Sequence, residues 1–306
     1  MPNWNEVFNE IGALQQQHVG VANRAIDLIR GQYLAKLHEH TRRNVISYYS
    51  GFLSKPGLAQ GYVIDEDKNG FMMAVHNLDR SKGLDLLIHT PGGGIAAMQS
   101  IVNYLHKMFN KDIRAIIPQI AMSAGTMIAC SCKSILMGTH SNLGPIDPHL
   151  RDIPTYGVLE EFKKAFEEIK QEPSKLAVWE PILRQYRPTF LSQCENAINW
   201  SNAFVQEQLE NVMFKGEKRG KQKAASVTKK LADYEGNKTH DRHIHAEECE
   251  AMGLKIERLE EDKTLQDLVL TVHHCYMHTF MNTPAIKIIE NHIGAGFVKI
   301  ETKNQP

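Results

Sequence analysis

The chain lacks the features that mark several large classes of protein. It has no excess of either charge, because 35 Lys and Arg residues balance 35 Asp and Glu residues. A balanced chain has no net field that attracts nucleic acid or an anionic membrane surface. No run approaches the ~20 apolar residues that span a bilayer, and the first residues lack the basic and apolar segments of a signal peptide. We therefore expect neither a nucleic-acid partner nor a membrane partner.

Cysteine is also scarce, and its number is odd. Only two of the five cysteines lie close together, as a C-x-C pair inside an apolar run, a pattern typical of buried small hydrophobes. An odd set of scattered thiols indicates a reducing compartment, so we expect a cytoplasmic location. The five are Cys130, Cys132, Cys194, Cys249 and Cys275.

Nucleotide and metal motifs are missing as well. The glycine-rich turn at 92–94 has neither the G-x-G-x-x-G spacing of a dinucleotide site nor the lysine of a P-loop. His243 and His245 stand before Glu247 and Glu248, but alternate histidines ahead of a helix are typical of a surface. A metal site needs three or four converging ligands. We expect no cofactor and no metal.

What the chain does contain is a repeated alternation of strand, turn and helix. Apolar runs at Leu84–His89, Ile113–Pro118 and Ser134–Met137 predict buried strands. Helical spacing over Ile95–Phe109 and the small-residue segment Met122–Cys132 predict the intervening helices. This order implies right-handed crossovers and a largely parallel sheet, so the fold class is α/β.

The rest of the chain divides by composition. Residues 1–42 predict an N-terminal helical extension, 43–260 the main domain, and 261–306 a C-terminal helix and tail. Within the main domain, 156–235 is charged and helix-favouring, which indicates a helical insertion. Three prolines are expected to divide this insertion into separate helices, namely Pro173, Pro181 and Pro188.

Ser123 is the candidate nucleophile. It lies in Ala-Met-Ser-Ala-Gly-Thr, after an apolar strand and at the start of a helix, where open α/β sheets place their sites. Parallel neighbouring strands would bring this turn beside the glycine turn. The N–H groups of Gly92, Gly93 and Ala124 could then stabilise an oxyanion. The alternative is that Ser123 only caps the helix, since serine is preferred at that position.

Four motifs in order resemble the serine dehydrogenase proteinase family, which is distantly similar to the Clp peptidase and to signal peptide peptidase A. They are LDLLIHTPGG, AMSAGT, LGPIDP and THDRHIHAEECEAMGL. The match is dense over residues 84–150 and good over 235–256. The resemblance implies a Clp/crotonase-like fold of stacked β-β-α units, with a serine nucleophile and a glycine-rich oxyanion turn.

The resemblance also assigns roles to single residues. Ser123 matches the nucleophile, and Gly93 with Ala124 matches the oxyanion donors. The family's order of Ser, Asp and His is met by Asp147 of GPIDP and His240 of THD, and we favour this pair as orienting acid and base.

Two other bases remain open at the level of the sequence. His149 with Asp241 follows the Ser, His, Asp order of the Clp peptidase, and His149 stands where glutamine is expected after GPIDP. A lysine from 163–175 would make a Ser-Lys dyad as in signal peptide peptidase A. Sequence spacing does not decide which group comes within about 3 Å of the serine hydroxyl.

These observations predict a serine hydrolase that cleaves peptides or unfolded segments through an acyl-enzyme and is independent of ATP in itself. Relatives place the site inside an oligomer, so the resemblance implies a homo-oligomer. Two alternatives use the same fold. A crotonase-type enzyme would act on acyl-CoA with the oxyanion turn alone, although it needs no serine at position 123. The second alternative is a catalytically inactive scaffold that forms an oligomer through its helical regions.

Overall fold

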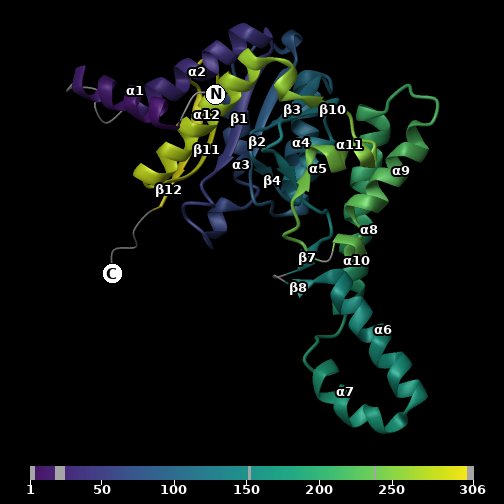
Figure 1. The fold of residues 1–306 in the computed structure, drawn as a ribbon. Coiled ribbons are helices and arrows are strands. Elements are labelled where there is room, and N and C mark those ends of the chain that lie inside the picture. Colours follow the sequence, from purple (N-terminus) through teal and green to yellow (C-terminus); the bar gives the residue numbers. More distant parts are fainter. Residues whose placement is uncertain (1–3, 18–24, 151–152, 238, 302–306) are drawn as a thin grey trace, which may run out of the picture.

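A central seven-stranded sheet organises the chain (Figure 1). The computed structural model describes residues 4–17, 25–150, 153–237 and 239–301. The spatial order of the strands is β10-β5-β3-β2-β1-β11-β12. Their bounds are β1 (Asn44–Ser50), β2 (Leu84–His89), β3 (Ile113–Ile117), β5 (Ser134–Met137), β10 (Ile256–Arg258), β11 (Ala285–Asn291) and β12 (Gly296–Ile300).

The run from β10 to β1 is parallel throughout, which confirms the predicted parallel sheet. Every residue of β1 and β2 is buried, as the unbroken apolar run of β2 predicted. The remaining two strands come from the C-terminal segment. β11 pairs antiparallel with β1, and β12 pairs antiparallel with β11. The region expected to be a helix and tail thus contributes two strands to the sheet.

Helices cover both faces of the sheet, and strand residues alternate between them. On one face Ile46, Tyr48 and Leu86 share a core with α3, α4 and α5. On the other face Val45 and Leu87 share a core with α2 and α12. α1 packs beyond α2 and α12. The bounds are α1 (Trp4–Gln17), α2 (Ala25–Thr41), α3 (Asp67–Val75), α4 (Ile95–Phe109), α5 (Ala124–Cys130) and α12 (Lys263–Asn282).

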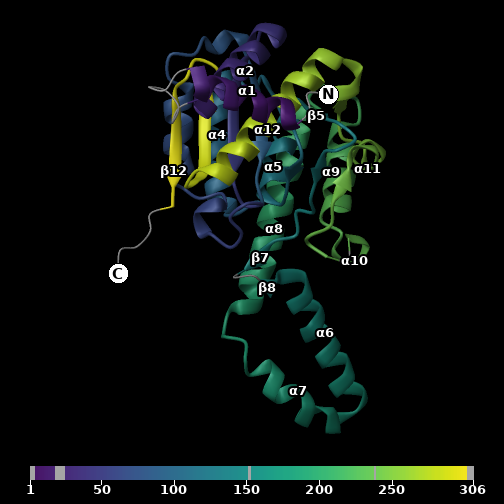
Figure 2. The same cartoon turned by 60° about the vertical axis from the view of Figure 1, so that its left-hand side comes forward.

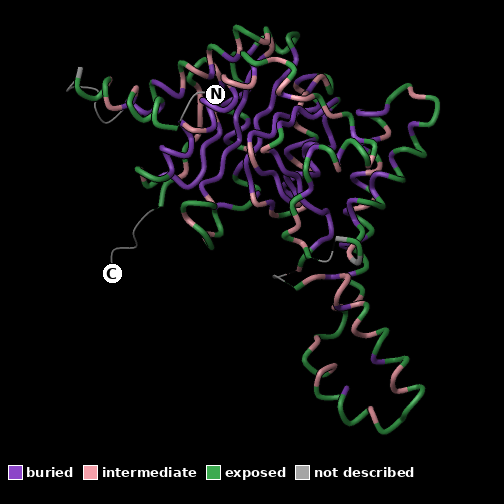
Figure 3. The backbone as a smooth tube through the Cα atoms, viewed as in Figure 1, coloured by how far each residue is buried: buried purple, intermediate pink, exposed green. Residues whose placement is uncertain are grey.

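The helical insertion has a projecting part and a packed part. α6, α7 and the beginning of α8 project from the body in both views (Figures 1 and 2), and this arm is largely exposed (Figure 3). The end of α8 and α9 instead add Phe204, Val205 and Val227 to the core of the main domain. The bounds are α6 (Thr155–Gln171), α7 (Leu176–Leu183), α8 (Phe190–Gln208), a π-helical turn (Leu209–Met213) and α9 (Gly220–Leu231).

The prolines divide the arm only in part. Pro173 and Pro188 lie between helices as predicted, whereas Pro181 lies inside α7. The prediction for Pro181 was therefore wrong. Proline removes the hydrogen bond to the carbonyl four residues earlier, which here belongs to Ala177. Both residues are exposed, so water can satisfy that carbonyl and the short helix tolerates the ring.

Several short elements lie beside the main sheet. A three-stranded sheet has the order β4-β6-β9, and β7 pairs with β8 in a small hairpin. The sequence predicted none of these two-residue strands. Among the described residues, no helix combines the length and apolar character needed to cross a membrane. The bounds are β4 (Ile120–Ala121), β6 (Asn142–Leu143), β7 (His149–Leu150), β8 (Ile153–Pro154), β9 (Ile244–His245), α10 (Tyr234–Asn237) and α11 (Ala246–Met252).

Candidate active site

The small three-stranded sheet brings together three segments that are far apart in the sequence. Ser123 follows β4 by two residues, Asp147 follows β6 by four, and His240 precedes β9 by four. Leu143 pairs with Ile244 in antiparallel register. Continuing that register by four residues sets Asp147 opposite His240. The order β4-β6-β9 therefore arranges a serine, a carboxylate and an imidazole along one edge.

Ser123 sits in a strained turn between β4 and α5. Its φ is 49° and its ψ is −110°, a backbone conformation that L-residues rarely adopt and that costs about 1–3 kcal/mol. Hydrogen bonds on either side hold the turn, because Met122 N–H donates to Thr90 O at 3.0 Å and Met127 N–H donates to Ser123 O at 3.0 Å. The side chain makes no capping hydrogen bond to the helix, so its hydroxyl is free for another partner.

The glycine turn packs directly against this serine. A Cβ on Gly92 would lie 2.7 Å from Ser123 Cβ, and one on Gly93 would lie 2.3 Å from Val63 N. Only glycine fits at either position, and both have positive φ, 101° and 150°. Val63 pairs with the turn from the other side. Its N–H donates to Gly92 O at 2.7 Å, and its carbonyl accepts from Gly94 N–H at 2.9 Å.

These contacts show which backbone donors remain free. Gly92 N–H donates to the Thr90 hydroxyl at 3.2 Å and Gly94 N–H to Val63 O at 2.9 Å. Within the described residues, the N–H groups of Gly93 and Ala124 have no acceptor. Gly92 was expected to be a donor, but its N–H is occupied, and its contribution is the close approach to Ser123. The free donors are therefore Gly93 and Ala124.

A buried ion pair that the sequence did not reveal anchors the strand-like segment around Val63. Lys287 of β11 is fully buried and its Nζ lies 2.7 Å and 2.8 Å from the two Asp67 carboxylate oxygens. The same ammonium group donates to Tyr62 O at 2.6 Å, and Ile64 N–H donates to Asp67 at 3.0 Å. The residues before and after Val63 are thus both tied to this pair. No local pattern signals it, because the two residues lie at opposite ends of the chain.

Asp147 is shared by two histidines. It is 2% exposed, its Oδ1 lies 2.9 Å from His240 Nδ1, and its Oδ2 lies 3.5 Å from His149 Nε2. The two imidazole rings lie 4.1 Å apart. Burial by itself would raise the pKa of the Asp147 carboxyl, but the hydrogen bonds from His149 and His240 outweigh it and hold the pKa below its usual value. Asp147 therefore carries a negative charge at neutral pH.

The packed part of the insertion holds the segment that carries Asp147. Ile146 N–H donates to Leu231 O of α9 at 3.1 Å, and the Ser201 hydroxyl of α8 donates to Ile146 O at 2.8 Å. On the other side the Thr155 hydroxyl donates to Pro148 O at 2.8 Å. The insertion thus positions the carboxylate as well as forming the arm.

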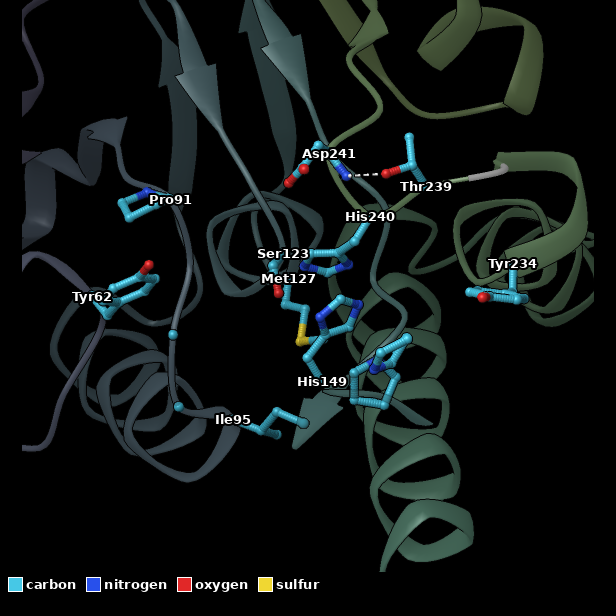
Figure 4. A pocket seen from close by; sticks show the side chains of 14 residues that line it. Tyr62, Pro91, Ile95, Ser123, Met127, His149, Tyr234, Thr239, His240 and Asp241 are labelled. Carbon is cyan, nitrogen blue, oxygen red and sulfur yellow. Dashed lines mark hydrogen bonds between the residues drawn. The ribbon is translucent and has the colours of Figure 1, made fainter. Parts of the chain in front are cut away.

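Ser123, His149 and His240 all line one cavity of about 710 Å³. Figure 4 shows Ser123 and both imidazole rings among the side chains that line this cavity. Ten further residues and Asp241 complete the wall: Tyr62, Pro91, Gly93, Gly94, Ile95, Met127, Pro148, Pro154, Tyr234 and Thr239.

The placement of the alternative bases follows from this geometry. The carboxylate next to His149 is that of Asp147, not that of the exposed Asp241. Among the described residues that line the cavity there is no lysine, and Lys163, Lys164, Lys170 and Lys175 lie on or after the projecting helix α6. The structure therefore does not bring a lysine from 163–175 to Ser123.

Sequence reasoning missed most of the cavity wall. Tyr62 and Tyr234 lie in segments with no motif, and Met127 looked like one more apolar residue of α5. His89, which directly precedes the glycine turn region, is not among the residues that line the cavity. It is fully buried, and its ring nitrogens lie 3.1 Å from Ser50 O and 3.3 Å from Gln119 Oε1. Chemically, the assembled groups are those that acyl transfer requires: a hydroxyl, an imidazole held by a carboxylate, and two free N–H donors.

Comparisons with known proteins agree with this chemistry. The sequence model of a family described as ClpP-like SDH-type serine proteinase matches residues 23–291. Two relatives come from Methanocaldococcus jannaschii, and both are named only as uncharacterized proteins. One is 32% identical over 68% of this chain, the other 28% identical over 64%. The alignments span 65% and 59% of the relatives themselves, so the chain covers less than two thirds of each.

Proposed function

The chain belongs to the family of ClpP-like SDH-type serine proteinases, and from that premise we propose that it is a serine peptidase that cleaves peptides or unfolded segments. The observation that carries the proposal is the Asp147–His240 contact of 2.9 Å, with His240 and the strained Ser123 lining one cavity. A buried charged carboxylate that orients an imidazole is the arrangement that activates a serine hydroxyl.

The reaction follows in two steps. His240 takes the proton of the Ser123 hydroxyl while the oxygen attacks the peptide carbonyl carbon. The carbonyl oxygen becomes an oxyanion that accepts hydrogen bonds from Gly93 and Ala124. The protonated imidazole then gives its proton to the leaving amine, which produces an acyl-enzyme. In the second step a water molecule loses a proton to His240 and attacks the acyl carbon. His240 then gives this proton to the Ser123 oxygen as the ester bond breaks, which regenerates Ser123 and releases the carboxylic acid. Neither step needs a cofactor or ATP.

We propose His240 rather than His149 as the base. His240 Nδ1 lies 2.9 Å from Asp147, whereas His149 Nε2 lies 3.5 Å away. When Nδ1–H donates to a carboxylate, Nε2 is left unprotonated and can accept the serine proton. For His149 the nitrogen nearest the carboxylate is Nε2, so only Nδ1 would be left to accept the serine proton.

The proposal includes the setting of the enzyme. A cavity of about 710 Å³ accommodates a short extended segment rather than a folded domain. A homo-oligomer is supported by apolar side chains exposed on the arm, among them Phe166 and Val178, both 64% exposed. A cytoplasmic location is supported by the cysteines, all five of which are free and buried in the described structure.

A fluorophosphonate probe tests the central claim, because it reacts only with an activated serine. We expect the probe to label the wild-type chain and not the Ser123→Ala variant. Circular dichroism and thermal unfolding would establish that both proteins are folded. A folded, oligomeric wild-type chain that takes no label would rule out the hydrolase and favour the inactive scaffold.

The choice of base has its own experiment. Removing a general base costs about 10²–10⁴-fold in rate, so His240→Ala should lose labelling to that extent and His149→Ala should lose less. The reverse order would assign the base to His149. If neither variant loses labelling, both assignments are wrong.

The oligomer is tested by sedimentation of the full chain. We expect an assembly larger than the monomer and a shift towards the monomer in a variant that combines Phe166→Glu with Val178→Glu. Leu53→Glu, at another exposed apolar residue outside the arm, is the matched control. A wild-type monomer at micromolar concentration would overturn the assembly.

A further inference from the structure

The second histidine beside Asp147 gives the site a feature that peptide hydrolysis does not use. One donor atom each from Asp147, His149 and His240 lies within 4.8 Å of the other two. We propose that these three side chains bind a divalent transition-metal ion, zinc best, and that the bound ion reversibly switches the peptidase off. Metal binding is inferred from the ligand geometry alone, whereas the effect of the ion on activity depends on the proposed peptidase function.

The donor set fits zinc in type. Two imidazoles and one carboxylate, with a fourth position left open, are a ligand set that zinc takes in proteins. Magnesium and calcium prefer all-oxygen sites, and soft copper(I) prefers sulfur. The two imidazole nitrogens therefore argue against magnesium and calcium, and the lack of a thiol argues against copper(I).

The donor set also fits in size. Zinc binds nitrogen and oxygen at about 2.0–2.2 Å, so two ligands of one tetrahedral ion stand about 3.4 Å apart. His240 Nδ1 and Asp147 Oδ1 are 2.9 Å apart, and His149 Nε2 and Asp147 Oδ2 are 3.5 Å apart. The His149 separation lies about 0.1 Å from the required value, and the His240 separation is about 0.5 Å shorter than it. An ion can therefore replace the protons between these groups with small side-chain rotations, as metals displace protons from their ligands.

The site has both a fixed wall and an open side. The Asp147 side chain is 3% exposed and is held in its segment by α8 and α9, whereas His240 and His149 are 20% and 29% exposed. Both histidines line the cavity that contains Ser123. An ion can enter through this cavity, and water from the cavity can fill its fourth position. Within the described part of the chain, no other group of three His, Cys, Asp or Glu side chains brings its donor atoms this close.

Bound at Nδ1, the ion would remove the base. Coordination needs the lone pair of His240 Nδ1, so the neutral ring must carry its proton on Nε2. Nε2 is the nitrogen that has to be unprotonated in order to accept the Ser123 proton. The ion also takes the carboxylate that orients the ring. Metal binding and serine activation therefore exclude each other, and removal of the ion restores the site.

Binding is tested by titrating the full-length Ser123→Ala chain with Zn²⁺ by calorimetry and with Co²⁺ by visible absorption. We expect one ion per chain and the strong visible bands of tetrahedral cobalt. His149→Gln in the same background should weaken binding by at least about tenfold, since even supporting groups outside the ligand set cost this much. The matched control is His243→Gln, at an exposed histidine outside the cluster, which should bind as before. Equal affinity with and without His149, or no stoichiometric binding, would overturn the metal site.

The switch is tested on the wild-type chain with the fluorophosphonate probe. Stoichiometric Zn²⁺ should suppress labelling, and EDTA should restore it. In His149→Gln, whatever its own rate, the same Zn²⁺ should change labelling far less. Unchanged labelling of a chain that calorimetry shows to be saturated would overturn the switch. A chain that never reacts with the probe, even after EDTA, would overturn the proposed function, while the titration still decides the metal site.

Discussion

At the scale of single residues, the site depends on glycines that leave no space for a side chain. Gly92 touches Ser123, and Gly93 touches the backbone of Val63. The strained φ of Ser123 persists because Thr90 and Met127 bond the backbone on either side of it. Strain of this kind is kept where the surroundings over-determine it, and such positions cluster at active sites.

Gly92→Ala tests this tight contact. The new Cβ would lie 2.7 Å from Ser123 Cβ, so the serine must move, and a displacement of this order at a reacting group costs about 100-fold in rate. We expect fluorophosphonate labelling to fall by that factor while the chain still folds.

Gly57→Ala is the control for this substitution. Gly57 also has positive φ, 79°, but a Cβ there meets no atom within 4 Å. The Gly57→Ala substitution should cost about 1–2 kcal/mol of stability through backbone strain alone. It should leave the rate of fluorophosphonate labelling unchanged. Equal labelling rates in the two variants would show that contact with Ser123 does not matter.

At the scale of elements, the oxyanion turn is supported from β11, a strand that is separated from β2 by β1 in the sheet. Lys287 lies on β11, which reaches the turn through Tyr62 and Val63 rather than through the strand that precedes it. Burial lowers the pKa of Lys287, and the Asp67 charge opposes that effect. The Tyr48 hydroxyl donates to Asp67 at 2.7 Å and completes the network. A C-terminal strand therefore positions a site built mainly from the first half of the chain.

Lys287→Met separates stability from positioning. Removing one partner of a buried ion pair costs about 3–5 kcal/mol, because the other charge stays buried and unpaired. Adding Asp67→Asn removes that charge, so the double variant should recover part of the stability, measured by urea unfolding. The bond to Tyr62 O remains lost in both. We therefore expect the probe to label the double variant about tenfold more slowly than the wild type. This factor corresponds to an increase of about 1.4 kcal/mol in the activation free energy.

The control is the part-buried pair between Arg30 of α2 and Glu290 of β11, neither of which lines the cavity. Arg30→Met combined with Glu290→Gln should lower stability without slowing the probe. Full recovery of labelling in Lys287→Met/Asp67→Asn would contradict the positioning role and leave the pair as a structural one.

At the scale of the whole molecule, the buried His89 and the half-buried His292 make stability depend on pH. Burial lowers the pKa of His89 to about 4 from an ordinary 6.5, partly offset by its hydrogen bonds to Ser50 and Gln119. Burial likewise lowers the pKa of His292 to about 4. Above pH 6.5 these rings are neutral in both the folded and unfolded chain. Between about 6.5 and 4 only the unfolded chain takes up the proton, so acid favours unfolding.

We expect the free energy of unfolding to fall as the pH is lowered from 6.5 towards 4. His89 alone contributes a slope of up to about 1.4 kcal/mol per pH unit. Urea unfolding of His89→Gln across this range should show a shallower dependence. The exposed His76→Gln should keep the wild-type slope. If the free energy of unfolding depends on pH equally in the wild type and in His89→Gln, then His89 takes up its proton equally in the folded and unfolded chain.

The sequence by itself determined β2, β3 and β5 of the parallel run and the helices between them. β2, β5 and α4 begin and end at the predicted residues, because continuous apolar runs and helical spacing are local properties that each segment carries alone. The motifs also identified Ser123, the glycine turn and both histidines, since these residue types stand in a recognisable order. The resemblance to the family assigned roles to these residues, but it did not show that they lie close together in space.

Only the tertiary structure decided which groups meet. Strands of two residues show no periodicity, so β4, β6 and β9 and the register that sets Asp147 opposite His240 leave no trace in the sequence. The sequence likewise contains no pattern that pairs Lys287 with Asp67 or β11 with β1. Such contacts close long loops, whose entropic cost is met by packing across the whole domain. The carboxylate shared by His149 and His240 exists only once that packing is complete.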